Sequence, residues 1–306
     1  MKREPDRDKP LINWDVIQQM MFRRMPPPPR SPEGGGEGAD GMPGRGIGGW
    51  DGQADNYNRM IHMEARFTLN QVDCFDTSPT DTVLDIGCGP GRITMPMAER
   101  AASVTALDAS PKMLDHVRDN CAARGITNVD TLLCDWEDEE SAAKIEQHDI
   151  VICSRTVALS DIERIAALAR KWVALVIWAN GAPPIPAILG KLFEGTQEDG
   201  DARPSPPFPP MDRRFGNNVF YNLIYDHGFD PNVKLVEDGF ERVFASREEA
   251  ESELLKLSPD VSMNKIDRFR SNLASYLTER PDGSVYFLAP TRSIVYWFSP
   301  ERKIYD

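Results

Sequence analysis

Short runs of consecutive apolar residues recur between residues 82 and 179, about 20 to 25 residues apart. Each run ends at a glycine, a polar residue or an alanine, and such runs are typical of strands buried on both faces of a sheet. The runs are TVLDIG, SVTALD, NVDTLLCD, DIVICS and VALVIWA, at Thr82–Gly87, Ser103–Asp108, Asn128–Asp135, Asp149–Ser154 and Val173–Ala179. They predict five strands of one sheet.

Between these runs, apolar residues recur every three or four positions, which predicts amphipathic helices. One helix is expected over Arg92–Ala101 and another over Asp161–Lys171. Between them, Ser110 and Pro111 supply an N-cap and a first helical residue, and Gly125 ends that helix. Strands that alternate with helices form a parallel, doubly wound sheet, and its ligands bind at the edge where the carboxyl ends of the strands meet.

After residue 180 a proline-rich, irregular stretch interrupts the alternation. Beyond it, the pattern predicts helices over Asn218–His227, Ser246–Leu257 and Asn264–Leu277, and strands over Asn232–Asp238 and Ser284–Phe298, the last as one strand or a pair. We expect these strands to complete the same sheet. The predicted fold class is therefore α/β: a doubly wound, Rossmann-like, mostly parallel sheet of seven strands with helices on both faces, plus an N-terminal arm and a C-terminal helical insertion.

The front of the chain has a different composition. Leu11–Met25 is rich in apolar residues and predicts a short helix, which the prolines at Pro26–Pro29 end. Residues 31–49 are dominated by glycine, proline and acidic residues, as in a flexible linker. The division of the chain is therefore an arm (1–30), a linker (31–49), a ligand-binding core (50–180) and a last part with the final strands (181–306). The arm could be a lid, a dimer contact or a membrane-surface anchor, or it could pack on its own chain.

Charge narrows the range of partners. The 306 residues include 35 basic and 48 acidic ones, for a formal net charge of −13 at pH 7. This balance disfavours duplex nucleic acid as a main partner, because phosphate binding needs a basic surface, and it suits cationic ligands. No apolar run is long enough to span a membrane, and the first ten residues lack the apolar core of a signal peptide. The five cysteines form no CxxC pair, so we expect reduced thiols in a cytoplasmic protein without a zinc site.

The most informative segment is VLDIGCGPGR, at residues 83–92. A predicted strand leads into Gly87, Gly89 and Gly91, and a predicted helix follows. Glycines permit positive φ and let a ligand lie against the backbone, while the amides of a helix start favour an electron-rich group. A dinucleotide site prefers the spacing G-x-G-x-x-G, whereas the spacing here is G-x-G-x-G. Asp85 precedes the first glycine by two residues, and its carboxylate suits an ammonium or sulfonium centre better than a diphosphate.

Two further acidic residues follow neighbouring strands. Asp108 ends the second predicted strand, where a carboxylate can accept hydrogen bonds from both hydroxyls of a ribose. Asp135 and Trp136 end the third, where the carboxylate can accept from an adenine amino group while a backbone amide faces the ring. Because the carboxyl ends of parallel strands share one edge, the glycine turn and these residues together predict a site for a nucleoside.

At these residues the sequence resembles the class I S-adenosylmethionine-dependent methyltransferases. The resemblance rests on VLDIGCGPGR, LDASPKML, CDWED and DIVICS, covers the core of residues 50–180, and is loose in the last third, which would hold the insertions around the acceptor site. It implies S-adenosyl-L-methionine as the cofactor, S-adenosyl-L-homocysteine as the product, and no metal. The cofactor-binding residues that it implies are Asp85, Gly87, Cys88, Gly89, Pro90 and Gly91 at the methionine end, Asp108 and Ala109 at the ribose, Asp135 and Trp136 at the adenine, Ser154 near the methionine amine and the acceptor, and Tyr57, with Trp50, on a helix folded over the cofactor.

The activity implied by the resemblance is methyl transfer by in-line displacement. The protein must hold the acceptor atom about 3 to 3.5 Å from the methyl carbon, and it needs a general base only if the acceptor arrives protonated. No catalytic residue is therefore assigned. His62 could face the acceptor. Arg155 could bind an anionic acceptor, but it is expected in a surface salt bridge. The fourth predicted strand lacks the Asn/Asp-Pro-Pro-aromatic signature of relatives that methylate adenine or glutamine, which favours a small-molecule acceptor.

Two alternatives stay open. The chain could be a non-catalytic, regulatory protein that binds S-adenosylmethionine or S-adenosylhomocysteine, or a methyltransferase whose macromolecular acceptor docks on the N-terminal arm. No nucleic-acid partner and no membrane span are expected, and the arm could form a homodimer. A last cluster could line an acceptor pocket: Arg213, Arg214, Phe215, Tyr221 and Tyr225.

Overall fold

The computed structural model describes residue 13 and residues 16–17, 47–179, 185–197, 217–258 and 261–301. Most of the N-terminal arm and of the linker therefore lies outside the described residues, as do Arg213, Arg214 and Phe215. Residues 47–49 are helical rather than part of a linker, because they form the start of helix α2 (Ile47–Val72). The division of the chain before residue 50 thus shifts to residue 47.

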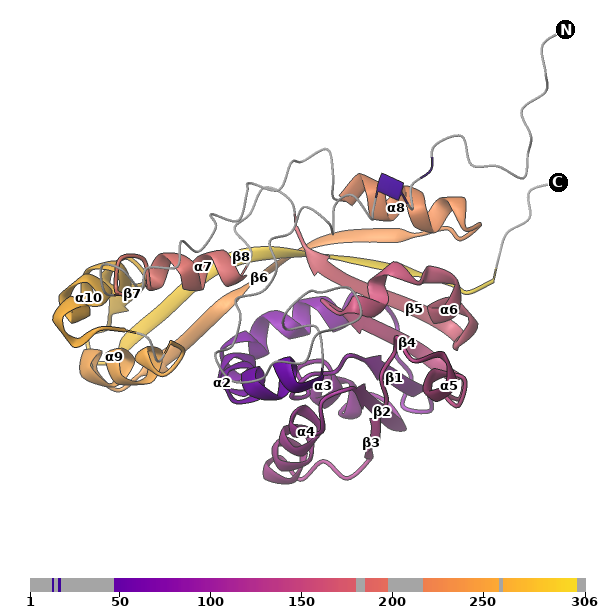
Figure 1. Cartoon of the computed structure of the whole chain (residues 1–306), viewed down its shortest axis with the longest axis horizontal. Coiled ribbons are helices and arrows are strands. Elements are labelled where there is room, and N and C mark those ends of the chain that lie inside the picture. The colour runs from indigo at the N-terminus through magenta and orange to yellow at the C-terminus, as the bar shows by residue number, and fades with distance from the viewer. Residues whose placement is uncertain are drawn as a thin grey trace, which may run out of the picture.

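The described residues form one sheet of eight strands at the centre of the molecule (Figure 1). Seven strands follow one another in the order β3-β2-β1-β4-β5-β8-β6, and β7 pairs with β8 beside this path. The strands are β1 (Thr82–Ile86), β2 (Ser103–Asp108), β3 (Val129–Leu133), β4 (His148–Ser154), β5 (Ala169–Trp178), β6 (Asn232–Phe244), β7 (Leu277–Glu279) and β8 (Val285–Phe298). The first five are parallel, and β8 is antiparallel to its neighbours β5 and β6. The predicted mostly parallel, seven-stranded sheet is confirmed, with β7 as a short addition.

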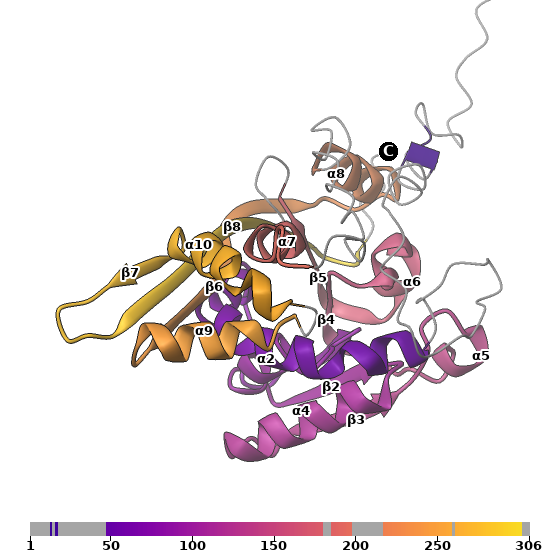
Figure 2. The ribbon, with the colours of Figure 1, turned by 60° about the vertical axis from the view of Figure 1, so that its left-hand side comes forward.

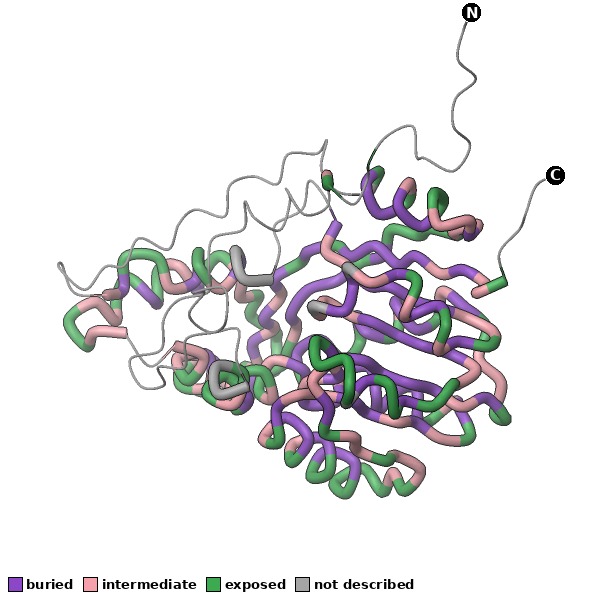
Figure 3. The backbone as a smooth tube through the Cα atoms, turned by 45° about the vertical axis from the view of Figure 1, so that its right-hand side comes forward, coloured by how far each residue is buried: buried purple, intermediate pink, exposed green. Residues whose placement is uncertain are grey.

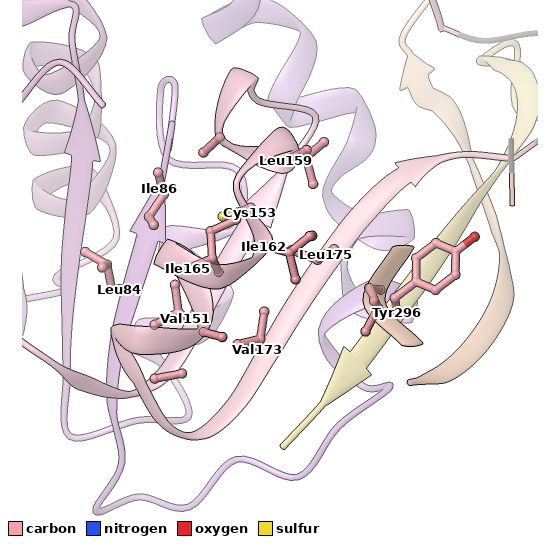
Figure 4. Close-up of a cluster of buried hydrophobic side chains, with 14 of the residues drawn as sticks. Leu84, Ile86, Val151, Cys153, Leu159, Ile162, Ile165, Val173, Leu175 and Tyr296 are labelled. Carbon is pink, nitrogen blue, oxygen red and sulfur yellow. The ribbon is translucent and has the colours of Figure 1, made fainter. Parts of the chain in front are cut away.

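Helices cover both faces of this sheet. One face carries α2, α3 (Thr94–Ala98) and α4 (Pro111–Ala123), and the other carries α5 (Glu139–Ala142), α6 (Ile162–Ala167) and α8 (Asn217–Asp226). Alternate residues of each strand face opposite sides: Val83 packs beneath α3, whereas Leu84 points to the side of α6 with Ile165 (Figure 4). The central strands are therefore buried along most of their length (Figure 3). Short 3₁₀ helices lie at Val157–Ser160 and Met263–Lys265.

The last part of the chain forms a lobe at one end of the molecule. Strands β6 and β8 continue past the sheet as a two-stranded ribbon, and α7 (Ile185–Leu192), α9 (Arg247–Leu255) and α10 (Ile266–Ala274) gather around its end (Figures 1 and 2). Their shared core contains Phe240, Phe244, Phe269 and Phe287, together with Met63 of α2. This lobe is the predicted C-terminal helical insertion. No helix among the described residues is both long and apolar enough to cross a membrane.

The strand order fixes where a ligand can bind. Chain connections from β1 lead outward through β2 to β3, and the chain then returns to place β4 on the other side of β1. In this arrangement Ile86 pairs with both Leu107 and Cys153, so the carboxyl ends of β1, β2 and β4 lie side by side. A parallel sheet binds its ligands at such a point of reversal.

Candidate functional site

The glycine turn follows β1 at this point. Gly87 and Gly89 have φ values of 68° and 54°, in the left-handed region that favours glycine. A β-carbon on Gly87 would lie 2.3 Å from Thr156 Oγ1, so a larger residue does not fit between the turn and the segment after β4. A β-carbon on Gly89 would have no atom within 4 Å. The open side of the turn is therefore at Gly89.

Asp108, the last residue of β2, is fixed beside this open side. Its Oδ2 accepts a hydrogen bond from the Gly89 amide and its Oδ1 one from the Ser110 amide, each at 2.9 Å. Burial raises the pKa of Asp108, and these amides oppose that effect only in part. Each oxygen keeps a further lone pair for a hydroxyl donor. Asp108 and the half-buried Ala109 thus lie at the shared edge, next to Gly89.

Asp85 lies beneath the turn rather than on its open side. The residue is 1% exposed, and its Oδ2 accepts a hydrogen bond from Thr94 Oγ1 at 2.7 Å. Burial raises the pKa of Asp85 to about 6. In this structure the carboxylate is therefore enclosed beneath the turn, and its expected place at the methionine end of a cofactor stays a prediction.

Cys88 and Pro90 tie the turn to its neighbours. The Cys88 amide donates to the Leu107 carbonyl at 2.9 Å, and the Pro90 carbonyl accepts from Asn120 Nδ2 at 3.0 Å. Burial raises the pKa of the Cys88 thiol well above its ordinary value, which keeps the thiol neutral. Both residues therefore hold the backbone in place. Gly91, with φ 95°, is buried against Val117 of α4.

The two residues after β3 lie in different surroundings. Asp135 is half-buried, and its Oδ1 accepts a hydrogen bond from the Glu137 amide at 3.0 Å, which closes a turn. Trp136 is 6% exposed, and the Arg164 guanidinium lies 4.1 Å from the centre of its ring. Asp135 thus stays at the edge of the sheet, whereas the Trp136 ring belongs to the core.

One side of α2 carries four residues at intervals of seven: Trp50, Tyr57, Glu64 and Gln71. The rings of Trp50 and Tyr57 meet edge to face with their centres 6.1 Å apart, and each residue is more than a third exposed. Glu64 and Gln71 are buried. This side of α2 therefore changes from open aromatic rings near its start to enclosed polar groups near its end.

The first half of α2 is fastened to α4. Asp51 accepts a hydrogen bond from the Ser110 hydroxyl and one from the Lys112 amide at 3.4 Å, so its carboxylate lies at the positive end of the α4 dipole. Asp55 accepts from Lys112 Nζ and faces His116 Nε2, each at 2.9 Å. These contacts hold α2 beside the segment that follows β2.

The second half of α2 is joined to the glycine turn by Arg92. This guanidinium donates to Thr68 Oγ1 at 3.1 Å, to Gln71 Oε1 at 2.7 Å and to Ser154 Oγ at 2.5 Å. Its Nε lies 3.7 Å from Glu64 Oε2. Ser154, at the end of β4, is therefore held by the residue that directly follows the turn.

Arg155, the residue after β4, is enclosed rather than exposed. Its φ of 57° is uncommon for a residue other than glycine. One guanidinium nitrogen donates to Glu64 Oε2 at 2.8 Å, and the other donates to Asp238 and, at 3.2 Å, to Ser293 Oγ. The side chain is 11% exposed, so the expectation of a surface salt bridge is wrong. Two arginines and two carboxylates instead form a buried ionic network of Arg92, Arg155, Glu64 and Asp238.

Two grooves border α2. One, of about 230 Å³, separates it from α3, and the other, of about 260 Å³, separates it from β6 and α9. His62 is exposed and lines the second groove, two residues from Glu64 and so on the other side of the helix.

The exposed rings of Tyr221 and Tyr225 stack on each other on α8. Within the described part of the chain, no group of three His, Cys, Asp or Glu side chains is arranged to hold a metal ion.

The sequence patterns did not point to Glu64, Asp238 or Ser293. For Glu64 a signal was present, because it follows the aromatic pair by one more interval of seven residues. Asp238 and Ser293 carry no such signal, since they meet Arg155 only through the pairing of β6 with β8.

Residues 83–176 match the family described as “Methyltransferase domain”. An uncharacterized protein of Haemophilus influenzae is 30% identical over 131 residues, which make up 41% of this chain and 48% of that protein. A 23S rRNA (uracil(1939)-C(5))-methyltransferase of Klebsiella pneumoniae is 40% identical over 58 residues, 19% of this chain and 13% of that enzyme. The match thus spans about half the length of the first relative and much less of the second.

Two solved structures extend the comparison. The YcgJ protein of Bacillus subtilis superimposes with a TM-score of 0.45 and 12% identity, over 77% of this chain and 99% of that one. Magnesium protoporphyrin IX methyltransferase of Synechocystis, with bound S-adenosylhomocysteine, superimposes with a TM-score of 0.36 and 19% identity, over 60% of this chain and 77% of that one.

Proposed function

Because residues 83–176 match the family described as “Methyltransferase domain”, we propose that the chain is a class I methyltransferase that transfers a methyl group from S-adenosyl-L-methionine to a small-molecule acceptor. One observation carries this proposal: the open side of the glycine turn at Gly89 adjoins a carboxylate, Asp108, that backbone amides hold in place. A ligand can lie against the backbone there and donate its ribose hydroxyls to Asp108. The residues present therefore fit an adenosyl cofactor.

Further features of the edge support the same ligand. Asp135 stands at the end of β3, within the row of strand ends that an adenosyl group would follow. The exposed rings of Trp50 and Tyr57 offer aromatic faces on the side of α2 that carries Glu64, and such faces attract a positively charged sulfur. Asp85, buried beneath the turn, adds negative charge below it.

When bound, the cofactor supplies an electrophilic methyl carbon on a positively charged sulfur. The chain itself must bind the cofactor, orient the acceptor and exclude water. Asp108 and the open backbone at Gly89 would bind the cofactor, Ser154 and Arg92 fix the meeting point of β1 and β4, and α2 covers it. A small acceptor is favoured because α2 and the last part of the chain both border this point, through Glu64 and Asp238, and share one core through Met63.

Calorimetric titration with S-adenosylmethionine and S-adenosylhomocysteine tests the proposal. We expect both to bind, and we expect Asp108→Ala to weaken binding by about tenfold or more, because two charge-assisted hydrogen bonds are lost. Asp115→Ala is the control, since Asp115 is exposed on α4 and pairs only with Arg118 among the contacts described. Absence of binding by the wild type, or equal binding by the Asp108 variant, would contradict the proposal.

RNA is the second candidate acceptor, because one matched relative is named as a ribosomal RNA methyltransferase. The net charge of −13 opposes it, since an RNA backbone needs a basic surface. A labelled methyl group separates the two: transfer into the low-molecular-mass fraction of a cell extract supports the small-molecule acceptor, and transfer into the RNA fraction replaces it. Cofactor binding without transfer into any fraction would point to the non-catalytic, regulatory role.

A further inference from the structure

Glu64 lies where the loops that follow β1 and β4 meet. Arg92, the first residue after the glycine turn, approaches Glu64 Oε2 to 3.7 Å, and Arg155, the first residue after β4, donates to the same oxygen at 2.8 Å. The two loops are in direct contact, because Thr156 fills the space that a β-carbon of Gly87 would need. The carboxylate is thus held from both sides at the meeting point of the two strands.

The second oxygen of Glu64 is left for another donor. The residue is 5% exposed, and both described ion pairs use Oε2, while Oε1 accepts no hydrogen bond from the described residues. Some described side-chain atoms lack both solvent contact and a hydrogen-bond partner. Glu64 Oε1 is not one of them, so this oxygen keeps some contact with solvent. A carboxylate oxygen without a partner can accept a hydrogen bond, and then a proton, from a donor that comes within hydrogen-bond reach.

Neighbouring charges keep this arrangement in place. Two guanidinium groups, of Arg92 and Arg155, face two carboxylates, of Glu64 and Asp238, so the network is balanced without an added ion. Burial alone would raise the pKa of Asp238, but Arg155, Arg92 and the hydrogen bonds from Ser293 and the Gly239 amide together lower it, so Asp238 stays ionised. The strained φ of Arg155 directs its guanidinium into the network, since such a conformation persists only where surrounding contacts hold it.

Tyr57 lies near the same carboxylate. Burial raises the pKa of the Tyr57 phenol, the charge of Glu64 raises it further, and Arg155 lowers it. The phenol therefore stays protonated and lies within the field of both groups. Tyr57 is more than a third exposed and lies about two helical turns before Glu64 on the same side of α2.

Resting on the proposed function, we infer that Glu64 Oε1 faces the position of the transferred methyl group and accepts the proton of an acceptor whose nucleophile is a hydroxyl or an amine. The nucleophile forms its bond to the methyl carbon as the carbon–sulfur bond breaks, with that electron pair going to sulfur. Its proton moves to Glu64. The positive charge on sulfur and the negative charge on the carboxylate disappear together, and the proton then leaves to water.

Sinefungin tests the position of Glu64 without a methyl acceptor, because it carries an amino group on carbon where the cofactor carries its methylsulfonium. By calorimetry, wild type should bind sinefungin about 10- to 100-fold more tightly than S-adenosylhomocysteine, since the amino group donates to a carboxylate. Glu64→Gln should lose most of that preference while its affinity for S-adenosylhomocysteine stays within about threefold. Glu241→Gln is the control: it removes the same charge from a residue of β6 that pairs with Arg66 and Tyr286, and it should keep the preference.

Turnover gives a second readout. In the labelled-methyl assay with the low-molecular-mass fraction, Glu64→Gln should reduce the rate about 100-fold or more, the usual contribution of a general base. Should Glu64→Gln fail to fold, as judged by circular dichroism, Glu64→Asp keeps the charge but withdraws the carboxylate, and it should also lose the preference for sinefungin.

The possible failures can be told apart. If wild type binds neither S-adenosylhomocysteine nor sinefungin, the proposed function is wrong. If wild type binds both and the folded Glu64 variants keep its preference and its rate, the function stands and the role of Glu64 is overturned.

Discussion

Gly87 and Gly89 share a left-handed backbone and differ in what surrounds them. Alanine at either position should cost about 1 to 2 kcal/mol of stability for the left-handed conformation. Gly87→Ala should cost about 1 to 3 kcal/mol more, because its β-carbon would collide with Thr156 at 2.3 Å. Gly89→Ala should instead reduce affinity for S-adenosylhomocysteine, since its β-carbon enters the open space. Urea unfolding and calorimetry of both variants measure these effects, and equal behaviour of the two would contradict the assignment of the open side to Gly89.

Asp85 makes stability depend on pH. Its pKa is about 6 in the folded chain and 3.8 without the fold, so between these values the folded chain holds the extra proton. The contribution of Asp85 to the free energy of unfolding is therefore largest below about pH 4 and falls as the pH rises. Above pH 6 the free energy of unfolding is lower by about 3 kcal/mol. Asp85→Asn lacks this titration. Urea unfolding at about pH 4 and pH 7 should show wild type losing about 3 kcal/mol relative to the variant, whereas parallel curves would contradict the effect.

The sequence identifies the glycine turn and Asp108 because their roles depend on local backbone and on the ends of strands. The sequence does not reveal whether a carboxylate near a strand end lies on the open side of the turn or beneath it. Asp85 points under the turn because it shares a face of β1 with Val83, whose neighbours are buried beneath α3. Arg155 is enclosed because Asp238 and Ser293 reach it from distant strands, a placement that no local pattern encodes.

At the scale of elements, α2 decides how the edge is covered. The sequence indicates this helix only through Trp50 and Tyr57, whereas the helix runs for 26 residues and contacts α4, the glycine turn and β6. Its halves are fastened independently, the first at Ser110 and Lys112 and the second at Arg92. A ligand between these points therefore touches a helix held at both ends.

Hydrogen exchange of α2 tests this arrangement. S-adenosylhomocysteine at about 100 times its dissociation constant should slow exchange in both halves of α2 together, by up to about 100-fold, because opening of the helix then requires loss of the ligand. Mass spectrometry of peptides from each half measures the effect. Protection confined to the segments after β1 and β2 would show that α2 does not cover the ligand.

Pairing between strands that are distant in sequence changes the predicted bounds of other elements. The helix expected over Asp161–Lys171 ends at Ala167, since Ala169 pairs with His148 and begins β5. Strand β6 runs to Phe244 because β8 offers it a partner along its whole length, which a window of local sequence cannot detect. The alternation of strands and helices up to residue 179 follows from hydrophobic periodicity alone and is confirmed by the sheet order.

For the whole molecule, the edge formed by the carboxyl ends of the parallel strands lies between α2 and the C-terminal lobe, which are far apart in sequence. Met63 of α2 packs in the same cluster as Phe240 and Phe269 of the C-terminal lobe. The ionic network repeats this connection, since Glu64 comes from α2 and Asp238 from β6. Residues before and after the matched range 83–176 therefore meet at this edge of the sheet, where the proposed acceptor would bind.

The position of β8 has a consequence for biosynthesis. This strand lies between β5 and β6, although both are made before it, and its pairing with β5 joins residues more than a hundred positions apart. While the ribosome is still producing the lobe, the edge of β5 and the whole of β6 have no neighbour in the sheet. Such unpaired edges invite intermolecular association, so this interval is when the nascent chain is most exposed to aggregation.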